Sequence, residues 1–201
     1  MAILKAEIIE AKRALYNHGV IAFPTETVMG LGVLYNDQAA YDKLNKIKRR
    51  PEDKPYTLMV KSTKDIGKYA EIDEATQRVI DAFMPGSLTI LVRVKEGAVP
   101  AYVTHGTNVI GIRVPSNASA LELLKEVEIP LLAPSANRSG EKTTLTSADT
   151  KAVFGSEIDF IVTGNAQKER PSTIVNLANN EVVVVREGPI SNEEILRVWK
   201  S

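Results

Sequence analysis

The sequence predicts an α/β protein, with a twisted mixed sheet, flanking helices and a concave ligand cleft. Short apolar runs rich in Val and Ile alternate with amphipathic segments, which is typical of strands alternating with helices. The alternation is irregular, which favours a mixed sheet over a strict repeat of parallel units. Polar loops follow several apolar runs, and loops at strand ends often converge on one ligand crevice. No linker, repeat or low-complexity tract divides residues 1–201, so we expect a single domain.

The first elements follow from apolar spacing and helix boundary signals. Apolar residues recur near helical spacing over 5–18, which predicts a helix, and the apolar run 20–23 predicts a strand. A second helix is expected to begin at Asn36 or Asp37, which are good N-cap residues, and to end at Pro51. Further strands are expected near 57–60, 88–94, 109–115, 131–133, 158–162, 172–177 and 182–185, and further helices near 64–70, 73–83, 117–127, 146–153 and from Ser191.

The composition excludes several classes of protein. The chain has no cysteine, which rules out disulfides, thiolate catalysis and iron–sulfur clusters. No signal peptide and no membrane-length apolar run is visible, so we expect a cytoplasmic protein without membrane contact. The 25 basic and 25 acidic residues balance, which argues against a broad nucleic-acid-binding surface. They leave a local basic cluster at Lys43, Lys46, Lys48, Arg49, Arg50 and Lys54.

The segment 23–32 has the sequence FPTETVMGLG and carries the first polar loop. It breaks an apolar strand at Pro24 and continues into polar, glycine-closed sequence, as ligand loops of α/β proteins often do. Gly30 and Gly32 would let backbone N–H groups approach a ligand closely and would permit positive φ. A plain strand, turn and second strand fits the same residues, so both interpretations stay open at this point.

Three polar regions could meet at one ligand: 24–32, 134–140 and the residues around 170–173. Together with the basic cluster and Arg186, they supply hydroxyls, amides and cations, which suit a phosphate-bearing ligand. Each type of residue also has an ordinary structural use, such as basic residues at a helix end or serines in turns. No phosphate-loop motif, complete dinucleotide fingerprint or metal-binding histidine pair is present. The residues alone indicate an α/β protein that binds an anionic, phosphorylated small molecule.

Seven stretches in order resemble the YrdC-like family, whose enzymatic members are threonylcarbamoyl-AMP synthases. They run from about residue 20 to about 190 and are Pro24–Gly32, Lys48-x-Arg50-Pro51 with Lys54-Pro55, Pro85–Thr89, Gly111–Pro115, Ala133–Gly140, Pro171–Val175 and Arg186–Gly188. The resemblance implies the short, single-domain type of the family.

The resemblance implies a nucleotidyltransferase that joins ATP, L-threonine and bicarbonate into threonylcarbamoyl-adenylate and releases pyrophosphate. Mg²⁺ would enter with ATP as the cofactor, with no metal ligands assigned to the protein. The product would pass to a tRNA-modifying threonylcarbamoyl transferase complex, and a direct tRNA contact is possible. The reaction needs alignment and charge neutralisation, and no nucleophilic side chain.

The resemblance also assigns residues to the two substrates. Lys48 and Arg50 would be catalytic, and the ATP-binding set would be Lys48, Arg50, Lys54, Ser135, Asn137, Thr143 and Arg186. The threonine-binding set would be Thr25, Thr27, Arg113, Ala133 and Ser172. The planar fork of an arginine can bind both oxygens of a carboxylate, so Arg113 is the expected partner of the threonine carboxylate. Met29 stands where most members have tyrosine, and it can replace the volume of a tyrosine but not its hydroxyl.

Two alternatives remain beside the synthase. The first is a non-catalytic RNA-binding module for tRNA or rRNA, against which zero net charge and few interleaved aromatics count. The second is a carbamoyl-adenylate-handling domain like those of hydrogenase-maturation proteins, against which the absence of fused domains counts.

Overall fold

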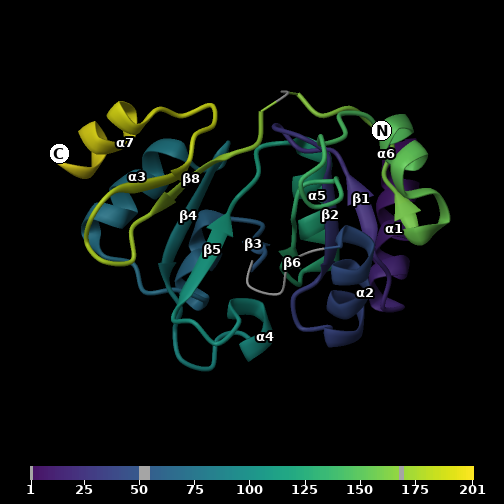
Figure 1. Ribbon diagram of the computed structural model, residues 1–201, viewed down its shortest axis with the longest axis horizontal. Coiled ribbons are helices and arrows are strands. Elements are labelled where there is room, and N and C mark those ends of the chain that lie inside the picture. The colour runs from purple at the N-terminus through teal and green to yellow at the C-terminus, as the bar shows by residue number, and fades with distance from the viewer. Residues whose placement is uncertain (1, 50–54, 168–169) are drawn as a thin grey trace.

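The computed structural model describes residues 2–49, 55–167 and 170–201, and in these residues one mixed sheet carries helices on both sides (Figure 1). The elements are α1 (Ala2–Tyr16), β1 (Ile21–Phe23), β2 (Gly30–Leu34), α2 (Gln38–Lys48), β3 (Thr57–Met59), η1 (Thr63–Lys68), α3 (Glu74–Phe83), β4 (Leu88–Arg93), α4 (Ala101–Thr104), β5 (Val109–Arg113), α5 (Ala118–Val127), β6 (Leu131–Leu132), α6 (Ser147–Phe154), η2 (Gly155–Glu157), β7 (Phe160–Ile161), β8 (Thr173–Asn176), β9 (Val183–Arg186) and α7 (Asn192–Trp199).

The sheet has nine strands in the described residues, in the order β7-β1-β2-β6-β3-β5-β4-β8-β9. The pairs β1–β7, β3–β5 and β4–β8 are parallel, and the other neighbouring pairs are antiparallel. The predicted mixed sheet is therefore confirmed. Strands distant in sequence become neighbours, so loops from both halves of the chain reach one region of the sheet. The extent of a single domain over residues 1–201 stays a prediction.

The two faces of the sheet bury separate apolar clusters, because successive side chains of a strand point to opposite faces. In β1, Ile21 and Phe23 pack with residues of α1 and α5, whereas Ala22 belongs to the larger cluster on the other side. The larger cluster also takes Leu44 and Ile47 from the apolar face of α2. In Figure 1, α1 and α6 lie at one end of the molecule and α3 and α7 at the other, with the sheet between them.

The predicted start of α2 is confirmed at Asp37, whose side chain accepts a hydrogen bond from the Ala40 N–H and caps the helix. The helix ends at Lys48, and Arg49 follows in the left-handed conformation with φ 50°. Pro51, the expected stop, lies outside the described residues.

The structure corrects the expected role of the two glycines in segment 23–32. Gly30 and Gly32 belong to strand β2, where neither has a positive φ, so residues 30–32 are not part of a loop. A Cβ atom at Gly32 would lie 2.9 Å from the Phe23 ring. The glycines therefore make room for the buried Phe23 ring across the strand pair. Gly30 also lines the cleft described below, so close approach of a ligand to its backbone stays a prediction.

Other boundaries differ by smaller amounts. The helix expected at 64–70 is the 3₁₀ helix η1, and the short helix α4 was not predicted. Helix α1 ends at Tyr16, two residues before the expected limit. In the described part of the chain, no helix combines the length and the apolar character that crossing a membrane requires.

Candidate active site

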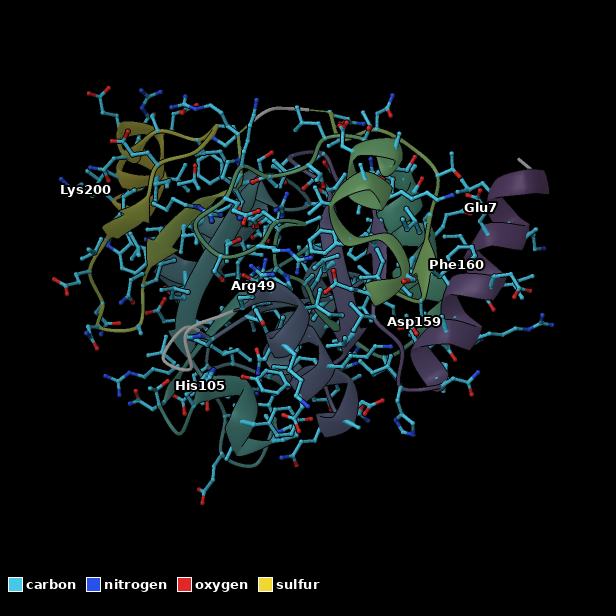
Figure 2. All side chains as sticks on the ribbon, turned by 45° about the vertical axis from the view of Figure 1, so that its right-hand side comes forward. Glu7, Arg49, His105, Asp159, Phe160 and Lys200 are labelled. Atoms are coloured by element: carbon cyan, nitrogen blue, oxygen red, sulfur yellow. The ribbon has the colours of Figure 1, made fainter. Side chains whose placement is uncertain are left out.

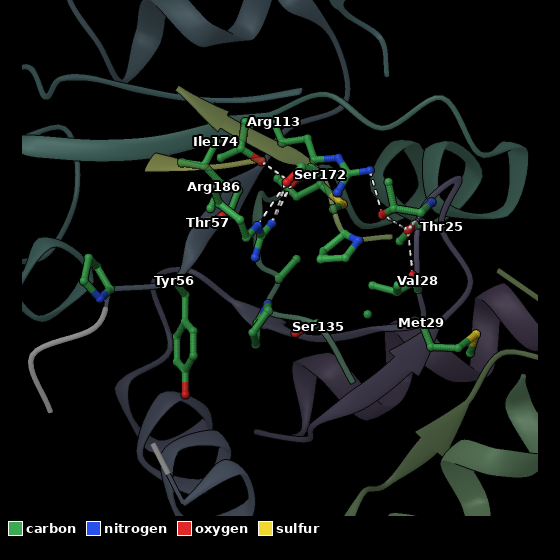
Figure 3. A pocket seen from close by; sticks show the side chains of 18 residues that line it. Thr25, Val28, Met29, Tyr56, Thr57, Arg113, Ser135, Ser172, Ile174 and Arg186 are labelled. Atoms are coloured by element: carbon green, nitrogen blue, oxygen red, sulfur yellow. Dashed lines mark hydrogen bonds between the residues drawn. The ribbon is translucent and has the colours of Figure 1, made fainter. Parts of the chain in front are cut away.

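A cleft opens across the sheet where the polar loops meet, and it encloses about 670 Å³ including the solvent space at its mouth (Figure 3). Strands β2, β3, β4, β5, β8 and β9 contribute to it, together with the loops beside them. Its described lining is Thr25, Thr27, Val28, Met29, Gly30, Pro55, Tyr56, Thr57, Met59, Thr89, Arg113, Ala133, Pro134, Ser135, Pro171, Ser172, Ile174 and Arg186. The expected convergence of the three polar regions is therefore present.

Arg113 ends strand β5 and enters the cleft as a buried, paired cation. Its Nη2 donates to Glu26 Oε1 at 2.6 Å and to Thr27 Oγ1 at 3.0 Å, and its Nε donates to the Gly86 carbonyl at 3.2 Å. Only 6% of Arg113 and 3% of Glu26 is exposed, so solvent screens this ion pair weakly. The side chain is thus held in one orientation by three neighbours, two of them in the segment that follows β1.

The hydroxyls of Thr25 and Thr27 are engaged within the protein. Thr25 Oγ1 donates to the Val28 carbonyl at 2.7 Å and lies 2.9 Å from Thr27 Oγ1. Both residues are buried and both line the cleft. These bonds close the turn between β1 and β2. The contact of Thr25 and Thr27 with substrate threonine stays a prediction.

Lys48 is held beneath the loop 134–140 by that loop's own oxygens. Its Nζ donates to the carbonyls of Ser135 and Asn137 at 2.7 Å each and approaches Asn137 Oδ1 at 3.3 Å. Only 1% of Lys48 is exposed, and it is absent from the cleft lining. A direct phosphate contact would require the ammonium group to leave these three oxygens. In this structure, Lys48 shapes the loop, and its phosphate contact stays a prediction.

Further bonds make the loop 134–140 continuous with its surroundings. The Ala136 N–H donates to the Met29 carbonyl at 2.7 Å, and the Ser139 N–H donates to the Lys48 carbonyl at 2.8 Å. Arg138 donates to the Ile47 carbonyl at 2.7 Å and pairs with Glu157. The hydrogen bond from Arg138 holds the pKa of the Glu157 carboxyl below its ordinary value. The loop is therefore fixed to the end of α2, to the segment before β2 and to η2.

The opposite side of the cleft centres on Ser172. Arg186 donates from Nε and Nη2 to the Ser172 carbonyl at 3.0 and 2.9 Å, and from Nη2 to Ser172 Oγ at 3.0 Å (Figure 3). Ser172 Oγ also lies 2.9 Å from Thr89 Oγ1. Ser172 is 3% exposed, whereas Arg186 is an exposed residue that lines the cleft. This side therefore presents the Arg186 cation to the cleft, and the buried Ser172 holds that cation through its carbonyl and hydroxyl.

The predicted site residues divide into three groups. Seven of them line the cleft: Thr25, Thr27, Arg113, Ala133, Ser135, Ser172 and Arg186. Lys48, Asn137 and Thr143 are described but do not line it, and Asn137 uses its amide to bind Ser135 Oγ and the Glu141 carbonyl. Arg50 and Lys54 lie outside the described residues. The roles assigned to all of these residues stay predictions.

The basic cluster does not act as one surface in the described residues. Lys43 pairs with Asp159 near β7, Lys48 is buried, and Arg49 caps the end of α2. Figure 2 shows Arg49 and Asp159 at separate places on the molecule. The cations of α2 therefore serve different neighbours.

Met29 is fully buried, with its side chain in the larger apolar cluster. Figure 3 shows that side chain directed away from Ser172 and Arg186. Met29 also lines the cleft, and its backbone N–H donates to the Thr144 carbonyl while its carbonyl accepts from the Ala136 N–H. In this chain, residue 29 is thus a core residue whose backbone joins the segment before β2 to the loop 134–140.

Several residues that line the cleft or support its lining were not assigned from the sequence. Glu26 holds Arg113, Thr89 supports Ser172, and Tyr56 lines the cleft while its hydroxyl donates to Asn45 Oδ1 at 2.6 Å. Glu26 and Thr89 lie inside two of the seven motifs, which was the available signal. Only the fold shows which partner each one meets.

The described lining of the cleft contains hydroxyls and arginines but no carboxylate. No cluster of three or more potential metal-binding side chains occurs among the described residues. Mg²⁺ in phosphate-transfer sites is commonly bound through substrate phosphates and water, with few protein ligands. The lining is therefore compatible with a magnesium ion that arrives bound to a nucleotide.

Comparison with known proteins places the chain in a family. The Sua5/YciO/YrdC family model, described as "Telomere recombination", matches residues 13–188. The chain belongs to this family. The threonylcarbamoyl-AMP synthase of Idiomarina loihiensis is 32% identical over 183 residues, covering 88% of this chain and 97% of that protein.

Two further relatives are longer than this chain. The threonylcarbamoyl-AMP synthase of Pyrococcus abyssi is 34% identical over 181 residues, covering 89% of this chain and 53% of that protein. The crystal structure of P. abyssi Sua5 complexed with L-threonine has a TM-score of 0.89 and 32% identity, covering 95% of this chain and 56% of that one. This member of the Sua5/YciO/YrdC family thus spans about half the length of those two chains and nearly all of the I. loihiensis protein.

Proposed function

We propose that this chain is an L-threonylcarbamoyladenylate synthase that uses ATP, L-threonine and bicarbonate to form threonylcarbamoyl-AMP and pyrophosphate. The observation that carries the proposal is the similarity to the I. loihiensis synthase along 97% of its length. The fold likeness to a Sua5 structure with bound L-threonine supports an amino-acid site in the cleft. The product would serve threonylcarbamoyladenosine modification of tRNA in the cytoplasm, through a transferase complex that receives the adenylate.

We assign the threonine side of the cleft to Arg113 and Ser172. Arg113 has its Nε and Nη2 committed to protein oxygens, which leaves Nη1 to meet a carboxylate oxygen. A charge-assisted bond of this kind is stronger than a neutral one. The Ala133 carbonyl lies in the adjoining wall and would accept an N–H from the amine or carbamate.

We assign the nucleotide side to the loop 134–140 and Arg186. Ser135 lines the cleft from a loop whose backbone is fixed by Lys48, so it can meet phosphate or sugar oxygens without further ordering. Arg186 adds a cation from the opposite side. Arg50, Lys54 and Thr143 complete the proposed set. Mg²⁺ bound to the triphosphate would neutralise part of its charge.

The proposed reaction balances without a protein nucleophile. The threonine amine and bicarbonate form an N–C bond and lose water, which gives a carbamate. A carbamate oxygen then bonds to the α-phosphorus of ATP while the bond to pyrophosphate breaks. The cleft would supply alignment and charge neutralisation, which can account for large rate enhancements.

Pyrophosphate release tests the proposal directly. The protein is incubated with ATP, Mg²⁺, L-threonine and bicarbonate, and with each substrate omitted in turn, and the adenylate is identified by mass. Release that requires all substrates is expected. Background release with the full set, together with tight RNA binding that weakens steeply with salt, would favour the RNA-binding module instead.

A further inference from the structure

Glu26 is a buried carboxylate that uses both of its oxygens on other parts of the fold. Oε1 accepts from Arg113 Nη2 at 2.6 Å, and Oε2 accepts from the backbone N–H of Asn117 at 3.2 Å. Asn117 is the N-cap of α5, so Glu26 links the segment after β1 to the end of β5 and the start of α5. Glu26 is 3% exposed and does not belong to the described lining of the cleft. It therefore acts on a ligand only through its neighbours.

The hydrogen bonds around Arg113 run in one direction. The hydroxyl proton of Thr25 is used on the Val28 carbonyl, so the bond between Thr25 and Thr27 must use the proton of Thr27. Thr27 Oγ1 then accepts from Arg113 Nη2. The two threonine hydroxyl protons and Arg113 Nη2 are therefore all used in hydrogen bonds, which run from Arg113 through Thr27 and Thr25 to the Val28 carbonyl. Arg113 cannot change its orientation in the cleft without breaking this chain and the pair with Glu26.

Among the nitrogens of Arg113, only Nη1 has no hydrogen bond within the described part of the chain. Its positive charge is already paired with Glu26. The arginine therefore offers a ligand a hydrogen-bond donor in a fixed position, and not an unpaired charge. The position of that donor depends on the carboxylate behind it.

We propose that Glu26 is a positioning residue for amino-acid binding, which fixes Arg113 so that Nη1 faces the carboxylate of the substrate. The proposal rests on the proposed function in one respect, that Arg113 meets threonine. Glutamine at position 26 would keep one acceptor but place an NH₂ group opposite either Arg113 Nη2 or the Asn117 N–H. In both arrangements the Arg113 guanidinium loses the negative charge that holds it, so its orientation becomes less fixed, while the nucleotide side of the cleft would keep its bonds.

Calorimetric titration with L-threonine, and separately with ATP and Mg²⁺, tests the proposal on the full chain. Glu26→Gln is expected to raise the Kd for threonine about 10- to 100-fold, the range for a lost bond to a charged group. The Kd for ATP should remain unchanged. Glu26→Asp keeps a carboxylate one methylene shorter and should recover part of the threonine affinity. Glu126→Gln, which removes an exposed carboxylate paired with Lys12, is the matched control.

The results separate failure of this proposal from failure of the proposed function. Threonine binding that is equal in wild type and Glu26→Gln would overturn the role of Glu26, as would a parallel loss of ATP affinity. A wild-type protein that binds no threonine would overturn the proposed function.

The NMR signal of the Arg113 Nε–H then still decides the positioning role without any ligand. It should move in Glu26→Asp and stay in place in Glu126→Gln, and an unmoved signal in Glu26→Asp would contradict the proposal.

Discussion

The two walls of the cleft are built in different ways. The loop wall consists of Thr25, residues 27–30 and residues 133–135, and the strand wall consists of Thr89, Ser172, Ile174 and Arg186. Buried side chains hold the loop wall from behind, with Lys48 1% exposed and Arg113 6% exposed. The strand wall ends at β9, an edge strand in which Val185 is 57% exposed.

This difference separates stability from binding. A buried cation that satisfies several oxygens cannot be removed without leaving some of them unpaired, so changes behind the loop wall should cost folding energy. An exposed arginine on an edge strand can be removed with little loss of packing. A change at Arg186 should therefore act on ligands more than on the fold.

The largest effect is expected for Lys48→Met. The change removes the donor shared by the carbonyls of Ser135 and Asn137 and should lower the free energy of unfolding by about 2–4 kcal/mol. Urea denaturation measures this loss. Lys46→Met, an exposed lysine on the same helix, is the control and should stay within about 0.5 kcal/mol of wild type. Equal stability of the two variants would show that the loop wall does not depend on Lys48.

Arg186→Gln should reverse this pattern at the strand wall. We expect the specificity constant for adenylate formation to fall by a factor that corresponds to about 1.5–3 kcal/mol, because a charge-assisted contact is lost. The free energy of unfolding should fall by about 1 kcal/mol or less. Arg93→Gln is the matched control, since Arg93 also donates to a backbone carbonyl, that of Ala178, away from the cleft. Unchanged turnover in Arg186→Gln would place Arg186 in a purely structural role.

Ser172→Ala is expected to have an intermediate effect on stability. The change removes the hydroxyl between Thr89 and Arg186 and leaves the buried Thr89 hydroxyl without that partner. Thermal unfolding should report a loss of about 1 kcal/mol. A fully stable Ser172→Ala protein would indicate that Thr89 finds another acceptor.

The smallest effect is expected for Glu157→Gln, which breaks the exposed pair with Arg138. The pKa of Glu157 is lowered from its ordinary value of 4.5 by the hydrogen bond from Arg138. The carboxylate therefore adds stability above about pH 4.5, and this is lost as the pH falls through the lowered value. Because the side chain is 47% exposed, we expect only a few tenths of a kcal/mol. The difference between the free energies of unfolding at pH 7 and pH 3 should be smaller in the variant than in the wild type. An unchanged difference would contradict the contribution of the pair.

Local signals predicted most of the elements but explained some residues wrongly. Asp37 was expected as a cap because a capping side chain needs only the next few residues. Gly30 and Gly32 were expected in a loop that permits positive φ, whereas both lie in strand β2 against the Phe23 ring. Lys48 was assigned to ATP phosphates, which stays a prediction, and the structure adds that a loop far along the chain encloses its ammonium group. Phe23 lies within the same short segment as the glycines, but only the pairing of β1 with β2 brings them together, whereas Ser135 lies 87 positions from Lys48.

The sequence by itself determined most of the strands and helices and the set of polar segments, because apolar periodicity and capping act over a few residues. The seven motifs also indicated the family. Only the tertiary structure decided which groups pair in the cleft. The bonds from Arg113 to Glu26 and from Lys48 to Ser135 each join residues 87 positions apart. Such pairs depend on the strand order of the whole sheet, and burial then makes each pairing obligatory, since an unpaired buried charge or carbonyl is costly.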